Sequence, residues 1–249
     1  MGENEAMRTF KWWIIGIVLV CAFGFLIIQE SFVTIRGEDD VRLLYASNLN
    51  QICLAMNNYH DVYGRLPPSA TQSKDGKPLL SWRVLLLPFL EENSLCREFH
   101  LDESWDSPHN RPLLDKMPDV YAMMFEEKGM THYQVVVGPG TPFEKDGLTW
   151  NDFPDGRANT ILIVDAADGV PWTKPVDLQY DSTAPIGVIG SYHQKSIHFS
   201  RYTIGAHEVF NAAFADGSIH AFRKEKDPES LRGFLTRNGG EALEWSLIK

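Results

Sequence analysis

The sequence contains few cysteines and no pair of them in a metal-binding pattern. Only three occur in 249 residues, at Cys21, Cys53 and Cys96, and no CxxC is present. Such a sparse, odd set excludes a disulfide framework and a cysteine-based zinc site. Because free cysteine packs as a small hydrophobic residue, we expect Cys53 and Cys96 to be separate buried thiols, with a Cys53–Cys96 bridge as the alternative.

The short motifs of common enzyme classes are also missing. The sequence has no HExxH, no GxSxG, no P-loop and no GxGxxG after a predicted strand. Residues 138–142 are glycine-rich, but their two prolines remove amide donors that a phosphate-binding loop needs. We therefore expect no catalytic residue and no cofactor site, and we do not expect an enzyme.

Histidines and loop carboxylates are present without a spacing that defines a metal site. The eight histidines are His60, His100, His109, His132, His193, His198, His207 and His220. None falls in a tight ligand pattern. Asp152, Asp155, Asp165 and Asp168 lie near glycines, where carboxylates can hold Ca²⁺ but are also ordinary turn formers. We therefore assign no metal ligand, with calcium as the alternative.

Basic charge is scarce relative to acidic charge. The chain carries 23 Lys and Arg against 33 Asp and Glu, a formal net charge of −10. Nucleic-acid binding depends on a positive field over phosphate, so this balance argues against a nucleic-acid partner.

A long apolar run stands near the start. Residues 12–28, WWIIGIVLVCAFGFLII, are 17 residues without charge, which is the short end of the range that spans a bilayer. Trp12 and Trp13 are placed for an aromatic belt at one interface, and Ile28 ends the run. We therefore predict a transmembrane helix over residues 12–28, with the lipid bilayer as a partner.

The flanking charges predict the orientation of this helix. Arg8 and Lys11 precede the run, whereas acidic residues dominate after it. Because positive flanks stay inside, we expect residues 1–11 to be a short cytoplasmic N-terminus and the head to be extracytoplasmic. A cleaved signal peptide, a lipoprotein using Cys21 and a processed prepilin are alternatives, but each fits the local sequence less well than an uncleaved signal-anchor.

Residues 41–63 show the spacing of a one-faced helix, with apolar positions three and four residues apart. Gly64 and Pro67–Pro68 then predict its end. We expect residues 29–64 to be a stalk helix that continues from the membrane into a globular head over residues 65–249.

The head has signals for both helices and strands. We predict a loop over residues 69–78 and a helix over residues 81–99 that Pro88 kinks or divides. Asp216-Gly217, between two alternating runs, predicts a two-residue hairpin turn with positive φ at both positions. Further predictions are strands at residues 133–137 and 160–164 and a helix at residues 228–237. This order predicts an α+β head with mainly antiparallel strands.

A series of motifs resembles one family. In order they are NLNQICLAMNNYHDVYGRLPPS, DGKPLLSWRVLLLPFLEE, WDSPHN, VVVGPGTPF, NTILIVDAADGVPWTKPVDL, FNAAFADGSIHAF and LTRNGGE. They are similar to the planctomycete DUF1559 family, which resembles type II secretion pseudopilins, carries a C-terminal H-x9-DG signature, and was formerly linked to solute-binding proteins. The resemblance implies a pilin-like architecture and supplies no catalytic residue.

The chain departs from the family pattern in two places. Family members often begin with a prepilin-type cleavage segment, and none is seen here. The signature maps to His207, Asp216 and Gly217, but eight residues rather than nine separate the histidine from the aspartate. A structural role for His207 is favoured over binding.

Three functions remain as hypotheses. The leading one is a membrane-anchored, pseudopilin-like protein of the cell envelope, structural or related to secretion and surface assembly, with other pilin-like or secretion-system proteins as partners. The alternative is a tethered extracytoplasmic module that binds a solute or glycan, with Trp105, Trp150 and Trp172 as stacking faces. A hydrolase that uses the loop carboxylates is the third.

Overall fold

The computed structural model describes the chain in several stretches. They are residues 38–124, 126–183, 197–199, 202–204, 209–223, 231–243 and 245–247. The chain divides into two compact units, Met1–Val41 and Arg42–Lys249, and nearly all described residues belong to the second.

The predicted membrane anchor falls outside these stretches. This applies to the transmembrane helix at 12–28 with Trp12, Trp13 and Ile28, and to the cytoplasmic segment at 1–11. Within the stretches that are described, no helix is both long enough and apolar enough to cross a bilayer.

Helix α2, Glu38–Tyr63, confirms the helix predicted at residues 41–63. It ends as predicted, because Gly64 adopts φ +70° and its amide donates to the His60 carbonyl oxygen at 2.7 Å. Buried apolar residues recur on one face at intervals of four, three and four. They are Tyr45, Leu49, Ile52 and Met56.

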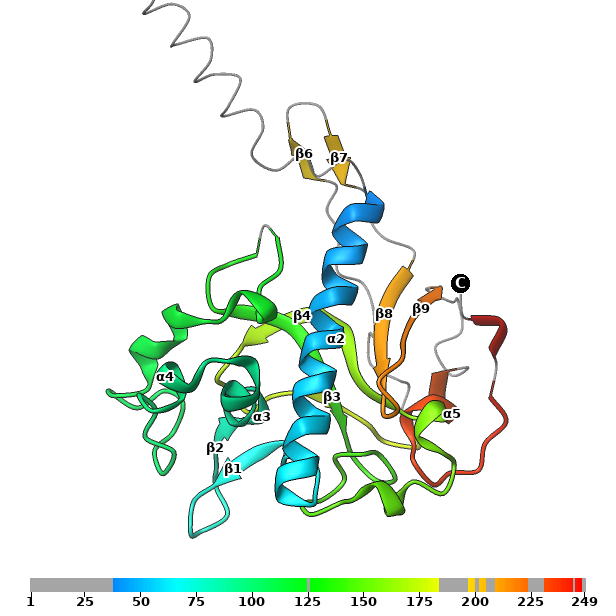
Figure 1. The fold of residues 1–249 in the computed structure, drawn as a ribbon, viewed down its shortest axis with the longest axis horizontal. Coiled ribbons are helices and arrows are strands. Elements are labelled where there is room, and N and C mark those ends of the chain that lie inside the picture. Colours follow the sequence, from blue (N-terminus) through cyan, green and yellow to red (C-terminus); the bar gives the residue numbers. More distant parts are fainter. Residues whose placement is uncertain are drawn as a thin grey trace, which may run out of the picture. The chain divides into compact units, whose positions relative to one another are not determined.

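A five-stranded sheet with the order β5–β3–β4–β8–β9 lies at the centre of the head (Figure 1). Its neighbouring strands are antiparallel except for β3 and β5, which are parallel. This confirms an α+β head with mainly antiparallel strands and the strands predicted at 133–137 and 160–164. The strand bounds are Met130–Val137 for β3, Ile161–Pro171 for β4, Leu178–Gln179 for β5, Val209–Phe214 for β8 and Ile219–Arg223 for β9.

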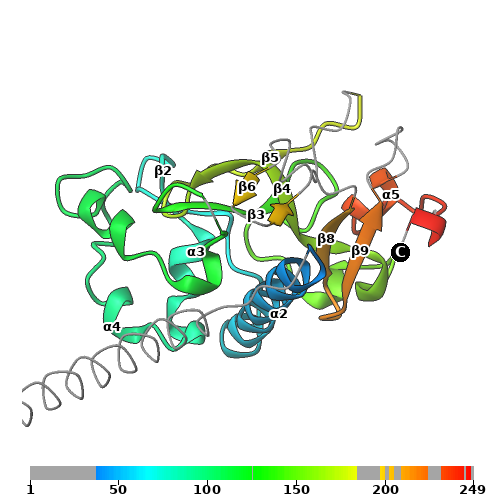
Figure 2. The ribbon, with the colours of Figure 1, turned by 90° about the horizontal axis from the view of Figure 1, so that it is seen from above.

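Helix α2 packs on this sheet, as the view in Figure 2 shows. The Tyr133 hydroxyl of β3 donates to the Tyr45 carbonyl at 3.2 Å, and the Cys53 thiol donates to the Phe214 carbonyl of β8 at 3.4 Å. A second apolar cluster holds the short helix α5, Arg232–Leu235, against β8 and β9. In it, the Phe234 ring lies 5.9 Å from that of Phe214.

Two short hairpins of the described structure were not predicted from the sequence. Residues 69–78, expected to be a loop, contribute to a hairpin of β1, Ala70–Gln72, and β2, Pro78–Ser81. A second hairpin pairs β6, Ile197–Phe199, with β7, Tyr202–Ile204. At the C-terminal end, the helix predicted at 228–237 is described only as α5, because 228–230 lie outside the described residues and Thr236 is extended.

The helix predicted across residues 81–99 is divided into short pieces. They are α3, Trp82–Leu85, the 3₁₀ helix η1, Leu87–Leu90, and α4, Asn93–Cys96. Pro88 stands in the first turn of η1, which confirms the predicted division, because proline has no amide to continue a helix. A second break at Glu91 was not predicted; its φ of +65° turns the chain out of η1.

A buried ion pair joins α3 to the strands beside it. Arg83 Nη2 lies 2.7 Å from Asp177 Oδ1, with the two side chains 0% and 2% exposed. The guanidinium also donates from Nε and Nη2 to the Tyr133 carbonyl at 2.9 and 2.7 Å, and from Nη1 to Ser81 Oγ at 2.7 Å. A buried guanidinium is tolerated when its donors are matched in this way.

Asp177 Oδ1 accepts further bonds from two other elements. Trp82 Nε1 donates to it at 3.2 Å, and the Val135 amide of β3 donates at 3.1 Å. The pair therefore fastens α3, β3 and the segment after β4 at a single buried point.

Replacing Arg83 with methionine should destabilise the head strongly, because Asp177 would keep its burial and lose its counter-ion. We expect Arg83→Met to lower the free energy of unfolding by about 3–5 kcal/mol, measured by urea unfolding with tryptophan fluorescence. Arg97→Met, at an exposed arginine near α4, is the matched control and should change it by less than about 0.5 kcal/mol. Equal stability of the two variants would contradict the assigned role.

Candidate functional site

The three tryptophans proposed as stacking faces do not line a common groove. Trp172 is fully buried and stacks on Tyr121, with ring centroids 6.0 Å apart. Trp105 is half-buried under the Lys174 ammonium, 5.4 Å from the ring centroid. Trp150 is half-buried against His60, 4.6 Å between ring centroids. All three are therefore engaged by neighbouring side chains.

Of the four candidate calcium ligands, two accept hydrogen bonds from backbone amides, one lies in the core and one is exposed. Asp152 accepts from the Thr149 amide at 2.8 Å and caps a 3₁₀ turn, and Asp155 accepts from the Gly240 amide at 3.1 Å. Asp165 is buried in β4, whereas Asp168 of the same strand is exposed. Across the described part of the chain, no three histidine, cysteine or carboxylate side chains could hold a metal ion together.

The expected thiols are unbridged. Cys53 is buried and Cys96 is half-buried, and both are free. Burial, reinforced by the Asp216 charge, raises the pKa of Cys53 to about 12, so this thiol is protonated and unreactive at neutral pH. Cys21 lies outside the described residues.

The family signature forms a turn whose shape differs from the prediction. Asp216 and Gly217 connect β8 to β9, but the loop has three residues, since the Phe214 amide donates to the Ser218 carbonyl at 2.9 Å. Gly217 has φ +94°, whereas Asp216 has no positive φ, so the expected two-residue turn is wrong. The pattern is that of a turn closed by a left-handed glycine, which three-residue hairpin loops favour.

Asp216 stabilises this turn through its side chain. Its Oδ1 accepts from the Ser218 amide at 2.9 Å and from the Ser218 hydroxyl at 2.7 Å. Partial burial acts to raise the pKa of Asp216, but these bonds and nearby His220 hold it below the ordinary value. His207, the third signature residue, lies outside the described residues.

The same turn is fastened to α2. Arg157 donates from Nε and Nη2 to the Ala215 carbonyl at 2.9 and 2.7 Å, and from Nη2 to Asn57 Oδ1 of α2 at 2.8 Å. These contacts attach the predicted turn to α2, which sequence spacing did not reveal.

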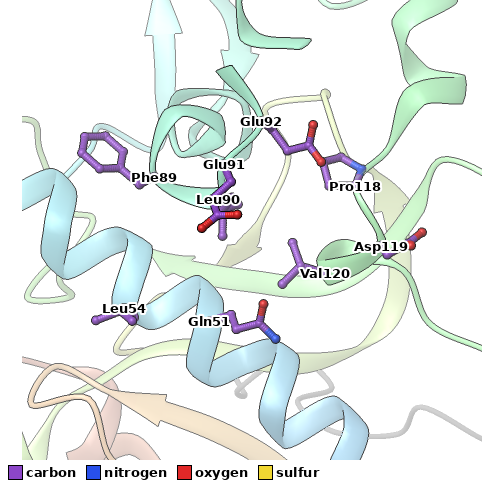
Figure 3. A pocket seen from close by; sticks show the side chains of 9 residues that line it. All are labelled: Gln51, Leu54, Phe89, Leu90, Glu91, Glu92, Pro118, Asp119 and Val120. Atoms are coloured by element: carbon purple, nitrogen blue, oxygen red, sulfur yellow. The ribbon is translucent and has the colours of Figure 1, made fainter. Parts of the chain in front are cut away.

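A pocket of about 420 Å³ lies beside α2 (Figure 3). Three segments line it: α2, the end of η1 with the turn that follows, and the 3₁₀ segment η3, Asp119–Tyr121, with the proline before it. The lining residues are Gln51, Leu54, Phe89, Leu90, Glu91, Glu92, Pro118, Asp119 and Val120.

Buried hydrogen bonds hold these walls together. The Tyr121 hydroxyl, at the end of η3, donates to the Arg83 carbonyl at 3.0 Å, which couples η3 to the helix just before η1. The Met124 amide donates to the Tyr45 hydroxyl at 3.0 Å, which couples the segment after η3 to α2. The backbone of Arg83, whose side chain forms the buried ion pair, is therefore hydrogen-bonded to the segment that forms one wall of the pocket.

The sequence did not predict this pocket. Glu91 and Glu92 were expected within the helix at residues 81–99, and residues 118–120 were assigned no role. A local signal was present, because Pro88 followed by two adjacent glutamates predicts that the acids leave a helical face. The meeting of three distant segments depends on the tertiary fold.

Asp165 gives a testable pH dependence. Its Oδ1 makes no hydrogen bond among the described residues, and burial raises its pKa from 3.8 to about 7. A raised acid pKa means that the native state binds the proton more tightly, so stability falls as pH rises from about 4 to about 7.

We expect Asp165→Asn to be more stable than the wild type at pH 8, by up to about 4 kcal/mol, with the gain vanishing near pH 4. Urea unfolding at a series of pH values measures this. Asp168→Asn, the exposed position on the same strand, should show no such gain. A gain for Asp165→Asn that is independent of pH would contradict the ionisation account.

Residues 46–122 match a family model described as "Protein of unknown function (DUF1559)". Neither the curated proteins nor the solved structures contain a match to the chain. All the residues that line the pocket fall within the matched segment, whereas the Asp216-Gly217 turn follows it. Residues 46–122 are therefore similar to the DUF1559 family, in agreement with the resemblance of the sequence motifs.

Proposed function

We propose that this chain is a membrane-anchored, non-enzymatic protein of the cell envelope, with a pseudopilin-like role in surface assembly or secretion. The observation that carries the proposal is the order of its elements. An uncharged run at residues 12–28 is followed after nine residues by α2, which lays its apolar face on a mainly antiparallel sheet. A tethered head of this kind acts by contact, with its N-terminus inside and its body outside.

The outer face of α2 supports a contact role. Leu43, Leu54 and Val62 are 63%, 58% and 66% exposed, and their spacing of eleven and eight residues keeps them on one side of a helix. Exposed apolar side chains that recur on one helix face are typical of surfaces that meet another molecule. The bilayer and other pilin-like or secretion-system proteins are the proposed partners.

The pocket beside α2 favours a second candidate, a tethered module for an extracytoplasmic solute. Its volume falls within the range of small-molecule sites. Recognition of a glycan by stacked tryptophans is less favoured, because Trp105, Trp150 and Trp172 are all engaged inside the head. This candidate shares the membrane anchor with the first.

The anchor is tested by charge placed in its centre. A double variant Val18→Glu, Val20→Glu should leave the membrane pellet after alkaline carbonate extraction, whereas the wild type should stay in it, because each central charge costs about 2.5–3.5 kcal/mol. The matched control is Phe32→Glu, Val33→Glu, just beyond the run, which should remain in the pellet.

External protease on intact cells should remove the head of the wild type if the orientation is as proposed. Recovery of the wild type in the soluble fraction without detergent would overturn the proposal, and so would protection of the head from external protease.

A further inference from the structure

The pocket beside α2 combines an apolar lining with an acidic one. Its apolar side chains are contributed by all three walls, and they are Leu54, Phe89, Leu90, Pro118 and Val120. Glu91, Glu92 and Asp119 add carboxylates from two of the walls and Gln51 adds an amide (Figure 3). None of the described residues that line the pocket is basic. Such a lining suits a ligand that has both an apolar body and positive charge.

Within the described part of the chain, the three carboxylates have no counter-ion. Elsewhere in the head, exposed acids do pair, as Glu98 does with Lys116 and Glu144 with Arg237. Among the ion pairs of the described residues, none involves Glu91, Glu92 or Asp119. Three acidic side chains at one pocket, in a chain of formal net charge −10, favour a cationic ligand over an anionic one.

The arrangement of the carboxylates discriminates between kinds of cation. In the described part of the chain, no three acidic, histidine or cysteine groups lie close enough to share a metal ion. A compact divalent metal ion therefore does not fit the three carboxylates, since it needs several oxygen ligands within about 2.6 Å. An elongated cation can reach separate carboxylates and cover the apolar lining between them.

We propose that this pocket binds an aliphatic diamine or polyamine, with its methylene chain on Leu90 and Val120 and its ammonium groups at Glu91, Glu92 and Asp119. The proposal goes beyond the envelope role above and does not depend on the membrane anchor. A role in surface assembly does not by itself require a small-molecule ligand, and this proposal adds one.

The backbone of Glu91 agrees with this assignment. Among the described residues, Glu91 is the one non-glycine residue with positive φ, at +65°. Glycine is the residue that this conformation favours, since it has no Cβ to clash. A glutamate here places a carboxylate at the pocket in spite of an unfavourable backbone.

The test is isothermal titration calorimetry of the full chain in a non-ionic detergent, with 1,5-diaminopentane as the probe. We expect one-to-one binding, weaker binding of pentylamine, and no heat from the uncharged 1,5-pentanediol. The double variant Glu91→Gln, Glu92→Gln should weaken diamine binding at least tenfold, and Val120→Trp, which fills the pocket, should abolish it. Two exposed acids outside the pocket provide controls, and Asp115→Asn and Glu127→Gln should bind within twofold of the wild type.

A further variant separates ligand binding from folding. Glu91→Gly should raise the Tm, because it relieves the left-handed backbone, and should weaken diamine binding at the same time. If Glu91 had only a structural role, Glu91→Gly would raise the Tm and leave diamine binding unchanged.

Four results would overturn the proposal. They are binding of pentanediol as tight as that of the diamine, equal loss in the control variants, displacement of the diamine by equimolar Ca²⁺, and binding of a lysine-rich peptide without binding of the free diamine. None of these results affects the membrane-extraction experiment, so the proposed ligand and the proposed anchor are tested independently.

Discussion

The described head depends on one buried electrostatic contact, the pair of Arg83 and Asp177. A buried ion pair stabilises a fold only when the hydrogen-bonding groups of both side chains are satisfied, because desolvation costs each charged group several kcal/mol. Here the guanidinium donates to Ser81, Asp177 and the Tyr133 carbonyl, and Asp177 accepts additional bonds from Trp82 and an amide of β3. The short pieces α3 and η1 have little helical stability of their own, since isolated helices of this length are marginal. Their position is therefore set by this contact.

The same contact shapes the surface where the pocket lies. The Arg83 carbonyl accepts from the Tyr121 hydroxyl, so the wall at η3 is held to α3, the helix that precedes η1. A pocket built this way is preformed, and a ligand needs little rearrangement to enter it. Glu91, Glu92 and Asp119 line this pocket together with Gln51 and Leu54 of α2.

Sequence reasoning succeeded where the structure is decided locally. The helical period of residues 41–63, the stop at Gly64 and the hairpin at Asp216-Gly217 follow from side-chain spacing and glycine conformation, and all three are present. It failed where distant contacts decide. The turn loop is longer than expected because Phe214 pairs with Ser218, and no pattern in the sequence shows that Arg83 is buried rather than on a helix surface. The pocket was missed for the same reason, since its three walls are separated by tens of residues.

The most direct test of the account is a double-mutant cycle of Arg83→Met and Asp177→Leu, read by urea unfolding. If the two side chains stabilise the head as a pair, removing both leaves no uncompensated buried charge. The double variant should then be at least as stable as either single variant, with a coupling energy of about 2 kcal/mol or more. Additive losses, with a coupling energy near zero, would contradict the central place given to this ion pair.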